Sequence, residues 1–204
     1  MLRVGLTGNL GSGKSTVATL FQKKGAHILA SDAIGRDLMQ PGEPVFQKIV
    51  DHFGRQVLTP TGELNRPTLA RIAFAEGRAE ELNAIVHPAV ITRQAELAEA
   101  LAQEDPHAIL IVESALIFES RHFTGTKRFD KILLVTAPEA DKIVRFTQRT
   151  GLPPEEAQRR LALQIPDAIK RPLADYTIEN DGSLAHLDAQ VDALWPIFQS
   201  LATQ

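Results

Sequence analysis

The chain has 204 residues, a net charge of −3 at pH 7 and no cysteine. This length favours one compact core with inserted segments over two independent domains. The absence of cysteine excludes disulfides and thiolate chemistry and suits a reducing cytosol, so we expect a cytoplasmic protein. No apolar run approaches the ~20 residues that span a bilayer, and the negative net charge argues against general nucleic-acid binding. We therefore expect no membrane and no nucleic acid as a partner.

The first predicted strand, Leu2–Leu6, ends at a glycine-rich loop, and a predicted helix, Lys14–Lys24, follows the loop. Residues Gly8 to Ser15 read GNLGSGKS, which fits the phosphate-loop pattern of glycine, four residues and then Gly-Lys-Ser/Thr. In such a loop, consecutive backbone N–H groups and the positive end of the following helix converge on phosphate oxygens. The strand before the loop and the helix after it therefore indicate a site for a purine triphosphate.

The side chains of the loop have separate predicted roles. Lys14 can reach the β and γ phosphates, and the hydroxyl of Ser15 can bind Mg²⁺. Asn9 stands where many such loops have glycine, and asparagine is among the side chains that tolerate a positive φ. The predicted nucleotide-binding residues of the loop are Gly11, Ser12, Gly13, Lys14, Ser15 and Thr16.

The second predicted strand, Ala26–Ala30, leads into a helix through Met39 that Ser31 or Asp32 can cap. Asp32 lies at the carboxyl end of this strand, the edge where open α/β sheets bind ligands, so it can face the phosphate loop. A phosphotransferase that acts on an alcohol needs a group to take the hydroxyl proton. Asp32 is the best-placed candidate for that group; the alternative is that it merely caps its helix.

The next stretch has little strand character and is predicted to be a helical insertion. Its predicted helices are 43–53, 67–75, 78–86 and 88–103, with a turn at 59–62. Asp51-His52-Phe53-Gly54 matches the Asp-x-x-Gly letters of a GTPase, but it follows a helical apolar pattern rather than a strand. Because the sequence also lacks the Asn-Lys-x-Asp guanine motif, we interpret the tetrapeptide as a helix end and disfavour a GTPase switch.

Strand character returns after the insertion. The predicted strands are 108–112, 131–135 and 176–179, and the predicted helices are 138–150, 155–164 and 184–201. The first two of these strands are nearly continuous apolar runs, as in parallel sheets that are covered on both faces. Five strands separated by helices predict a doubly wound α/β protein, with a five-stranded parallel sheet and helices on both of its faces.

Residues 121–171 form a basic segment with eleven basic and six acidic side chains. Arg145 and Arg149 are four residues apart and share one face of a predicted helix, and the next predicted helix carries two more arginines. The Gly-Leu-Pro-Pro turn at 151–154 between these helices suggests a helical lid that closes and excludes water. The alternative interpretation of the arginines is a solvated helical face.

Taken together, these motifs resemble the dephospho-CoA kinase family, and the similarity runs nearly end to end. It is carried by Gly5–Gly8 with Gly11–Ser15, Ser31-Asp32 with Ile34 and Arg36, His52–Gly54, Gly62–Arg66, His87-Pro88, Leu116–Glu119, Arg145 with Arg149, Gln164, Lys170-Arg171 with Ala174-Asp175, and Asn180. Only the phosphate loop is widely shared. The motifs at 62–66 and 87–88 fall in the helical insertion, where a simple nucleoside monophosphate kinase differs, so they make the resemblance specific.

The resemblance implies a P-loop kinase fold with three parts. The parts are a nucleotide-binding core of residues 1–32, 104–138 and 172–204, a helical domain of residues 33–103 for the CoA-type substrate, and a lid of residues 139–171. By the same resemblance, Asp32 corresponds to the catalytic aspartate, and the further catalytic residues are Lys14, Arg145 and Arg149.

The resemblance also implies binding residues. Arg66, His87 and Glu119 would line or brace the acceptor site, and Asn180 would meet the adenine of ATP. The alternatives are that His87 is a structural cap before a proline and that Asn180 is a plain turn residue.

The chain departs from the family pattern at two places. The family usually carries an Asp-x-Asp pair after the second strand, whereas this chain has Ala30-Ser31-Asp32 and keeps only the second aspartate. Glu113 adds a carboxylate at a strand end, where it can reach the water shell of Mg²⁺ or be a simple surface acid.

The implied activity is phosphorylation of the 3′-hydroxyl of the dephospho-CoA ribose by ATP with Mg²⁺, which is the last step of coenzyme A biosynthesis. Small-molecule substrates, ATP and dephospho-CoA, are the expected partners, and we expect a monomer or a small homo-oligomer. The alternatives are another small-molecule kinase, such as a nucleotide kinase, and a regulatory ATPase without a small acceptor.

Overall fold

A computed structural model describes residues 1–119 and 128–204 of the chain. The chain folds into two compact units: Met1–Leu29 with Leu101–Gln204 form the first, and Ala30–Ala100 form the second. Since the second unit is inserted between two parts of the first, the chain enters and leaves it once each. No helix in these described ranges is both long and apolar enough to cross a membrane.

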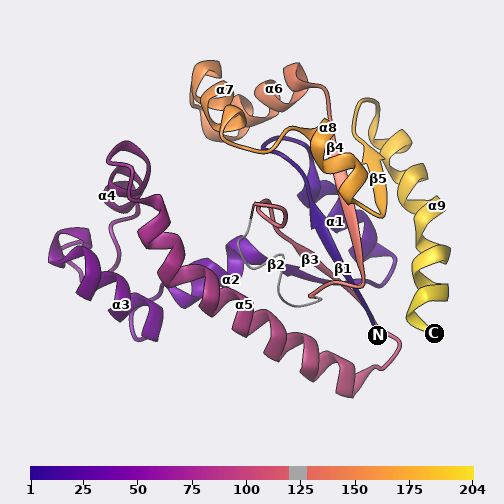
Figure 1. Cartoon of the computed structure of the whole chain (residues 1–204), viewed down its shortest axis with the longest axis horizontal. Coiled ribbons are helices and arrows are strands. Elements are labelled where there is room, and N and C mark those ends of the chain that lie inside the picture. Colours follow the sequence, from indigo (N-terminus) through magenta and orange to yellow (C-terminus); the bar gives the residue numbers. More distant parts are fainter. Residues whose placement is uncertain (120–127) are drawn as a thin grey trace. The chain divides into compact units, whose positions relative to one another are not determined.

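A five-stranded sheet forms the centre of the first unit, with the strand order β2-β3-β1-β4-β5 (Figure 1). The strands are β1 Leu2–Thr7, β2 His27–Ala30, β3 Ile109–Glu113, β4 Lys131–Thr136 and β5 Tyr176–Glu179. The central strand β1 pairs in parallel with both of its neighbours, so that Leu6 lies between Glu113 of β3 and Leu133 of β4. The predicted α/β architecture with a five-stranded parallel sheet is therefore confirmed.

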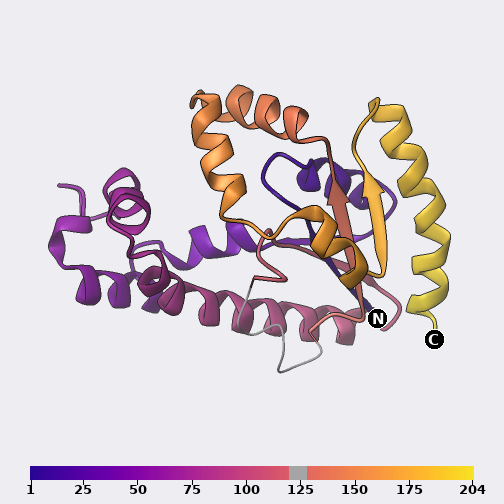
Figure 2. The ribbon, with the colours of Figure 1, turned by 45° about the horizontal axis from the view of Figure 1, so that its top comes forward.

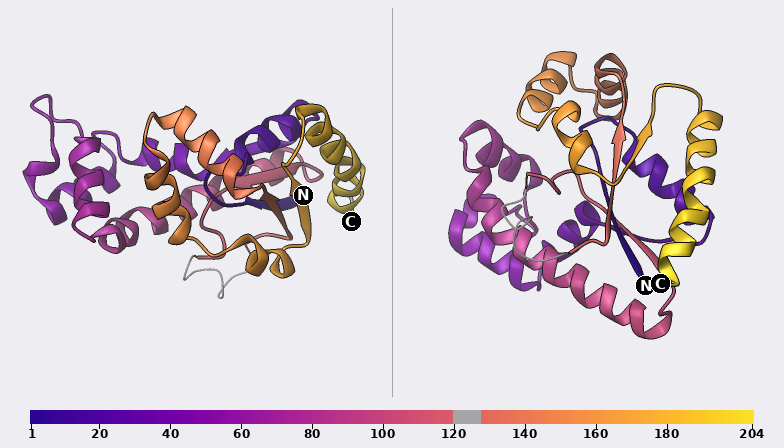
Figure 3. Two further views of the ribbon diagram at one scale, coloured as in Figure 1. Left: turned by 90° about the horizontal axis from the view of Figure 1, so that it is seen from above. Right: turned by 45° about the vertical axis from the view of Figure 1, so that its right-hand side comes forward.

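The helices of the first unit are α1 Lys14–Lys23, α6 Glu139–Thr150, α7 Pro154–Ala162, α8 Asp167–Lys170 with the short 3₁₀ turn η4 Arg171–Leu173, and α9 Leu184–Ala202. They pack on this sheet or, as α6 and α7 do, lie beyond the carboxyl ends of its strands (Figure 1). On one face, α1 and α9 lie side by side (Figure 3). The α6 and α7 helices form a hairpin whose arms pack on each other (Figure 2). The short helix α8 was not predicted, because four residues carry no helical period.

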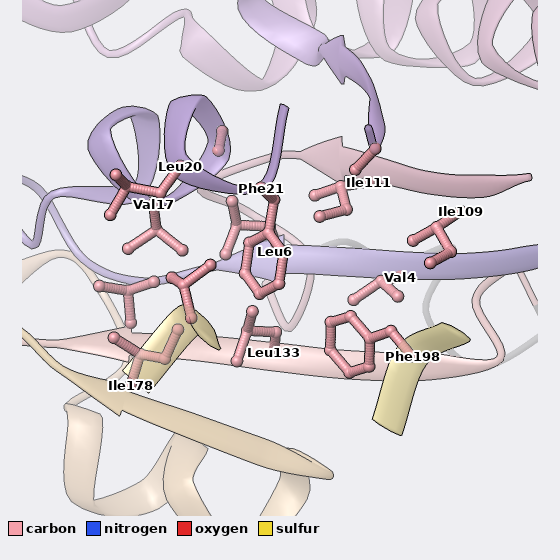
Figure 4. Close-up of a cluster of buried hydrophobic side chains, with 14 of the residues drawn as sticks. Val4, Leu6, Val17, Leu20, Phe21, Ile109, Ile111, Leu133, Ile178 and Phe198 are labelled. Carbon is pink, nitrogen blue, oxygen red and sulfur yellow. The ribbon is translucent and has the colours of Figure 1, made fainter. Parts of the chain in front are cut away.

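The main hydrophobic core lies between the sheet and the α1–α9 pair (Figure 4). Alternate residues of β1, Val4 and Leu6, are fully buried there, and Phe21 of α1 stacks on Phe198 of α9 with ring centroids 5.4 Å apart. The opposite face of β1 presents Gly5, where an added Cβ would lie 2.9 Å from the Ile117 side chain. Close packing on both faces explains why the strands are apolar almost throughout.

The second unit is helical, as predicted. Its elements are α2 Ser31–Leu38, α3 Pro44–Phe53, the 3₁₀ turn η1 Arg55–Val57, α4 Arg66–Ala70, the π-helical turn η2 Arg71–Ala75, and most of α5 Ala79–Glu104. The Asp-x-x-Gly letters are a helix end, as interpreted: α3 stops at Phe53 and Gly54 has a φ of +81°. This positive φ favours glycine, because a Cβ would be strained there.

One prediction for this unit is wrong, and a second is incomplete. Helices 78–86 and 88–103 form the single helix α5 with Pro88 inside it. A proline removes one backbone hydrogen bond, but the buried residues Val90, Gln94 and Ala98 anchor the helix beyond it, so the helix continues. The predicted helix 67–75 is a short α-helix followed by a π-helical turn, a distinction that side-chain spacing does not reveal.

Candidate active site

The phosphate loop joins β1 to α1, and its glycines adopt conformations that other residues rarely take. Gly8, Gly11 and Gly13 have φ values of +153°, +72° and +97°. An added Cβ on Gly8 would lie 2.3 Å from the carbonyl oxygen of Val135, and one on Gly11 would lie 2.3 Å from that of Lys142. The loop is thus pressed against β4 and α6 by close backbone contacts that only glycine permits.

Asn9 corrects one expectation for this loop. No non-glycine residue in the described ranges has a positive φ, so Asn9 does not use the tolerance expected of it. It is buried instead, at 4% exposure, and its amide Nδ2 donates to the carbonyl oxygen of Ile165 over 3.1 Å. The asparagine at this position is therefore explained by its side-chain contacts and not by its backbone conformation.

Lys14 and Ser15 stand at the start of α1, where the helix N-terminus favours anions. The Lys14 ammonium donates to the carbonyl oxygens of Gly8 and Asn9 over 2.8 and 3.2 Å. The Ser15 hydroxyl donates to Glu113 Oε1 over 2.8 Å, and Glu113 ends β3. The sheet thus places a hydroxyl and a carboxylate together beside the loop.

Asn180 and Arg145 contact the other side of the loop. Asn180 follows β5, and its Nδ2 donates to the Ser12 carbonyl oxygen over 2.8 Å. Arg145 of α6 donates to the carbonyl oxygens of Asn180 and Gly11 over 3.1 and 3.5 Å. Two residues predicted from different motifs thus meet at one loop.

The other arginines of the α6–α7 hairpin differ from Arg145. Arg149 is exposed one turn further along α6. On α7, Arg159 and Arg160 both donate to Glu156, and these hydrogen bonds lower the pKa of Glu156 to about 2. The first seven residues of the basic segment, 121–127, lie outside the described residues.

A hollow of about 320 Å³ lies at the carboxyl ends of β4 and β5. Its lining residues are Thr136, Ala137, Pro138, Asp167, Ala168, Arg171, Glu179 and Asp181. Asn180, which contacts the loop, lies between two of these lining residues in the sequence. The hollow therefore adjoins the segment whose Asn180 contacts the phosphate loop, and it is large enough for part of a small ligand.

Comparisons with known proteins agree with this geometry. The model of the dephospho-CoA kinase family matches residues 2–186, which is most of the chain. The chain belongs to the dephospho-CoA kinase family. A dephospho-CoA kinase of Thermobifida fusca is 39% identical over 200 residues, which cover 98% of this chain and 97% of that protein.

Solved structures are also similar to the chain. A protein of Thermus thermophilus has 33% identity and a TM-score of 0.77, with 96% of this chain and 97% of that one covered. The dephospho-CoA kinase of Campylobacter jejuni has 23% identity and a TM-score of 0.64, with 96% of each chain covered, and this likeness concerns the fold. Membership in the family makes the chain a P-loop kinase, that is, a phosphotransferase with an alcohol acceptor.

Three of the remaining predicted residues of this family member lie in the second unit, whereas Glu119 lies in the first. Asp32 is exposed in the first turn of α2, Arg66 is exposed at the start of α4, and His87 is half-buried within α5. The capping alternatives are wrong: Ala30 occupies the N-cap of α2 without a side-chain hydrogen bond, and His87 is not at a helix end. The Ser31 hydroxyl instead accepts from Gln94 Nε2 over 2.8 Å.

Sequence reasoning missed the contacts of Lys170 and Gln164. Gln164 Oε1 accepts from the backbone N–H of Leu10 over 2.8 Å. The Lys170 ammonium contacts Asn9 Oδ1 and Glu119 Oε1 over 2.7 and 2.6 Å. The only signal for them was their inclusion in the family resemblance, which assigned them no role.

Proposed function

We propose that the chain transfers the γ-phosphoryl group of ATP to the 3′-hydroxyl of the dephospho-CoA ribose, giving coenzyme A and ADP. The observation that carries this proposal is the match of the dephospho-CoA kinase family over residues 2–186, which includes a fully formed phosphate loop. Family membership supports phosphorylation of dephospho-CoA by ATP, and the choice of the 3′-hydroxyl rests on the resemblance.

The donor would bind along the carboxyl edge of β1, β4 and β5. Gly11 to Thr16 would hold the phosphates through backbone N–H groups, and Lys14 would exchange its carbonyl partners for the β and γ phosphates. The hollow beside Asn180 supports a place for the adenine there, because it opens next to the loop at the sheet edge where nucleotides bind.

Ser15 and Glu113 fit a Mg²⁺ ion that accompanies ATP. Their oxygens are 2.8 Å apart, and oxygen ligands are the ones that Mg²⁺ prefers. The described residues contain no group of three or more His, Asp or Glu side chains that could hold a metal, so ATP phosphates would complete its ligands. When bound, Mg²⁺ offsets the charge that develops on the transferred phosphoryl group.

Asp32 would orient the acceptor hydroxyl and take its proton. Arg66, His87 and Glu119 would line or brace the acceptor site, and residues 33–103 would form the substrate domain. Arg145 and Arg149 would neutralise the phosphoryl group from a lid of residues 139–171. The contacts of Arg145 with the loop support its part, since a small movement would bring its guanidinium to the phosphates.

The proposed location, oligomeric state and partners of the enzyme follow from its substrates. Both are small soluble molecules, so we propose a cytoplasmic enzyme that acts as a monomer or a small homo-oligomer without a nucleic-acid or membrane partner. This part of the proposal depends on the activity and is tested with it.

Measuring ADP release with Mg-ATP tests the function directly. The acceptors to compare are dephospho-CoA, a set of nucleoside monophosphates, and none. We expect release that depends on dephospho-CoA, with a 3′-phosphate in the product. Release that depends on a nucleoside monophosphate would indicate a nucleotide kinase, and release without an acceptor would indicate an ATPase.

Asp32→Asn tests the assigned base. The variant keeps the size of the side chain but removes its basicity, so turnover should fall at least ~10²-fold. Asp37, on the same helix α2, gives the matched control Asp37→Asn. Near-normal turnover of a folded Asp32→Asn protein would remove this role.

A further inference from the structure

Among the described residues of the first unit, Lys170 is the most deeply buried charged residue, at 0% exposure. Burying an ammonium group is costly unless it is paired and hydrogen-bonded. Its Nζ lies 2.6 Å from Glu119 Oε1, and it also donates to Asn9 Oδ1 over 2.7 Å. The charge is therefore compensated by one carboxylate and oriented by one amide of the phosphate loop.

The amide of Asn9 is oriented by this contact. An ammonium group can only donate, so the amide oxygen must face Lys170, and the Nδ2 group then faces the carbonyl oxygen of Ile165. The next loop residue is held as well, because the Leu10 N–H donates to Gln164 Oε1 over 2.8 Å. Two consecutive loop residues are thus attached to residues 164–170.

These attachments reach the catalytic lysine through the backbone. The Lys14 ammonium donates to the carbonyl oxygens of Gly8 and Asn9, and Asn9 is the residue whose side chain Lys170 holds. Residues 164–170 are in turn anchored to α6, because Lys142, only 6% exposed, pairs with Asp167. The shape of the loop therefore depends on a buried ionic network outside it.

We infer that Lys170 is a positioning residue for the donor phosphates, acting through Asn9 on the shape of the phosphate loop. We call the set of Lys170, Asn9, Glu119 and Gln164 the loop anchor. The inference deepens the proposed function, and it concerns nucleotide binding, which can be measured without any acceptor. Lys170 itself contacts the loop and a carboxylate, so it acts on the phosphates only through other residues.

The test is titration calorimetry, in which Mg-ADP is added to the protein and its Kd is measured. Loss of a charge-assisted hydrogen bond that shapes the loop should raise the Kd of Lys170→Met about tenfold. Asn9→Ala, which keeps the Lys170–Glu119 pair, should raise it about threefold or more and remains informative if Lys170→Met does not fold. In turnover, KM for ATP should rise in both variants. In Asn9→Ala, which leaves the Lys170–Glu119 pair intact, KM for dephospho-CoA should stay within about twofold of the wild-type value.

The matched control is Lys131→Met. Lys131 also pairs with a carboxylate, Asp175 at 3.1 Å, but its side chain is 33% exposed and it begins β4, at the sheet edge opposite the loop. The affinity of the Lys131→Met variant for Mg-ADP should equal that of the wild type. An unchanged Mg-ADP affinity of folded Lys170→Met or of Asn9→Ala, with only a lower melting temperature, would overturn the inference. A wild-type protein that does not bind Mg-ADP would instead refute the proposed function.

Discussion

Each of the two units contains a cluster of ionic side chains, and the clusters differ in burial. In the first unit, the side chain of Lys170 is 0% exposed and that of its partner Glu119 is 17% exposed. In the second unit, Arg78 and Glu81 form an ion pair whose side chains are 33% and 40% exposed, and His52 adds a contact to Glu81 over 2.6 Å. The first cluster lies beneath the phosphate loop, whereas the second joins α3 to α5 on the surface of its unit.

This difference in burial predicts how much stability each cluster contributes. A buried ion that loses its partner stays in a medium of low polarity, so breaking the pair is costly. An exposed ion that loses its partner is hydrated by water, so the loss is small. The Arg78 guanidinium also lies over the Phe53 ring, 4.7 Å from the ring centroid. An apolar side chain in place of Arg78 could keep this packing contact without the charge. The buried cluster should therefore control the site, and the exposed one should only support its helices.

The largest expected effect belongs to Lys14, the loop lysine that we propose binds the β and γ phosphates. Lys14→Ala should lower turnover at least ~10²-fold, because an aligned positive charge on the transferred group is lost. The melting temperature should fall less than in Lys170→Met, because Lys14 is half-buried whereas Lys170 is fully buried. Steady-state kinetics and thermal unfolding of the same sample check both statements. A large loss of stability would show that Lys14 belongs with the buried cluster.

Lys170→Met should have the next largest effect, and on stability. It leaves the partly buried Glu119 carboxylate without its cation, which typically costs about 3–5 kcal/mol of unfolding free energy. Urea unfolding measures the loss, and Lys131→Met serves as the exposed control. Equal losses of unfolding free energy in the two variants would contradict the expected difference between buried and exposed ion pairs.

Arg78→Met should have a smaller effect than Lys170→Met. Methionine keeps the apolar contact with Phe53 while the ion pair with the exposed Glu81 is lost. Urea unfolding of this variant beside Lys170→Met sharpens the comparison. A loss as large as that of Lys170→Met would show that the exposed cluster is a second structural anchor.

The smallest expected effect is on the acid side of the stability profile. Hydrogen bonds from Arg78 and then from His52 lower the pKa of Glu81 from its ordinary value of 4.5 to about 2. Since the folded-state pKa is the lower one, this contribution is present above pH 4.5 and is lost as the pH falls towards 2.

Glu81→Gln should therefore reduce stability slightly near neutral pH, and the difference from the wild type should vanish towards about pH 2. Chemical unfolding of both proteins across this range measures it. A difference that grows on acidification would contradict the sign of the shift.

Much of the fold could be predicted because short apolar runs and turn residues in the sequence mark its strands and helices. The strand 176–179 has the predicted bounds, β1, β2 and β4 deviate by one residue at one end, and β3 is shifted by one residue at both ends. The agreement is close because continuous apolar runs mark buried parallel strands. The break predicted at Pro88 is absent, because the packing of residues beyond it outweighs one lost hydrogen bond. Local propensity is a weak guide where tertiary contacts are strong.

For the site too, some features could be predicted from the sequence and others appeared only in the structure. The roles proposed for Arg66, His87 and Asn180 came from the family resemblance, and that of Asp32 came also from its position after the second strand. All four stay predictions, as does the part of Glu119 in the acceptor site. What the sequence offered no means to find was the pairing of that same Glu119 with Lys170. A lysine in a short helix looks like a surface residue until its surroundings are known.

By itself, the sequence determined the phosphate loop and the α/β class of this dephospho-CoA kinase family member. Eight contiguous positions, a preceding strand and a following helix suffice, because backbone N–H groups that are close in the chain are also close in space. Only the tertiary structure decided what Asn9 does. Its partner Lys170 is 161 residues away, and the burial that makes the contact necessary exists only once the sheet, α6 and α8 have packed together.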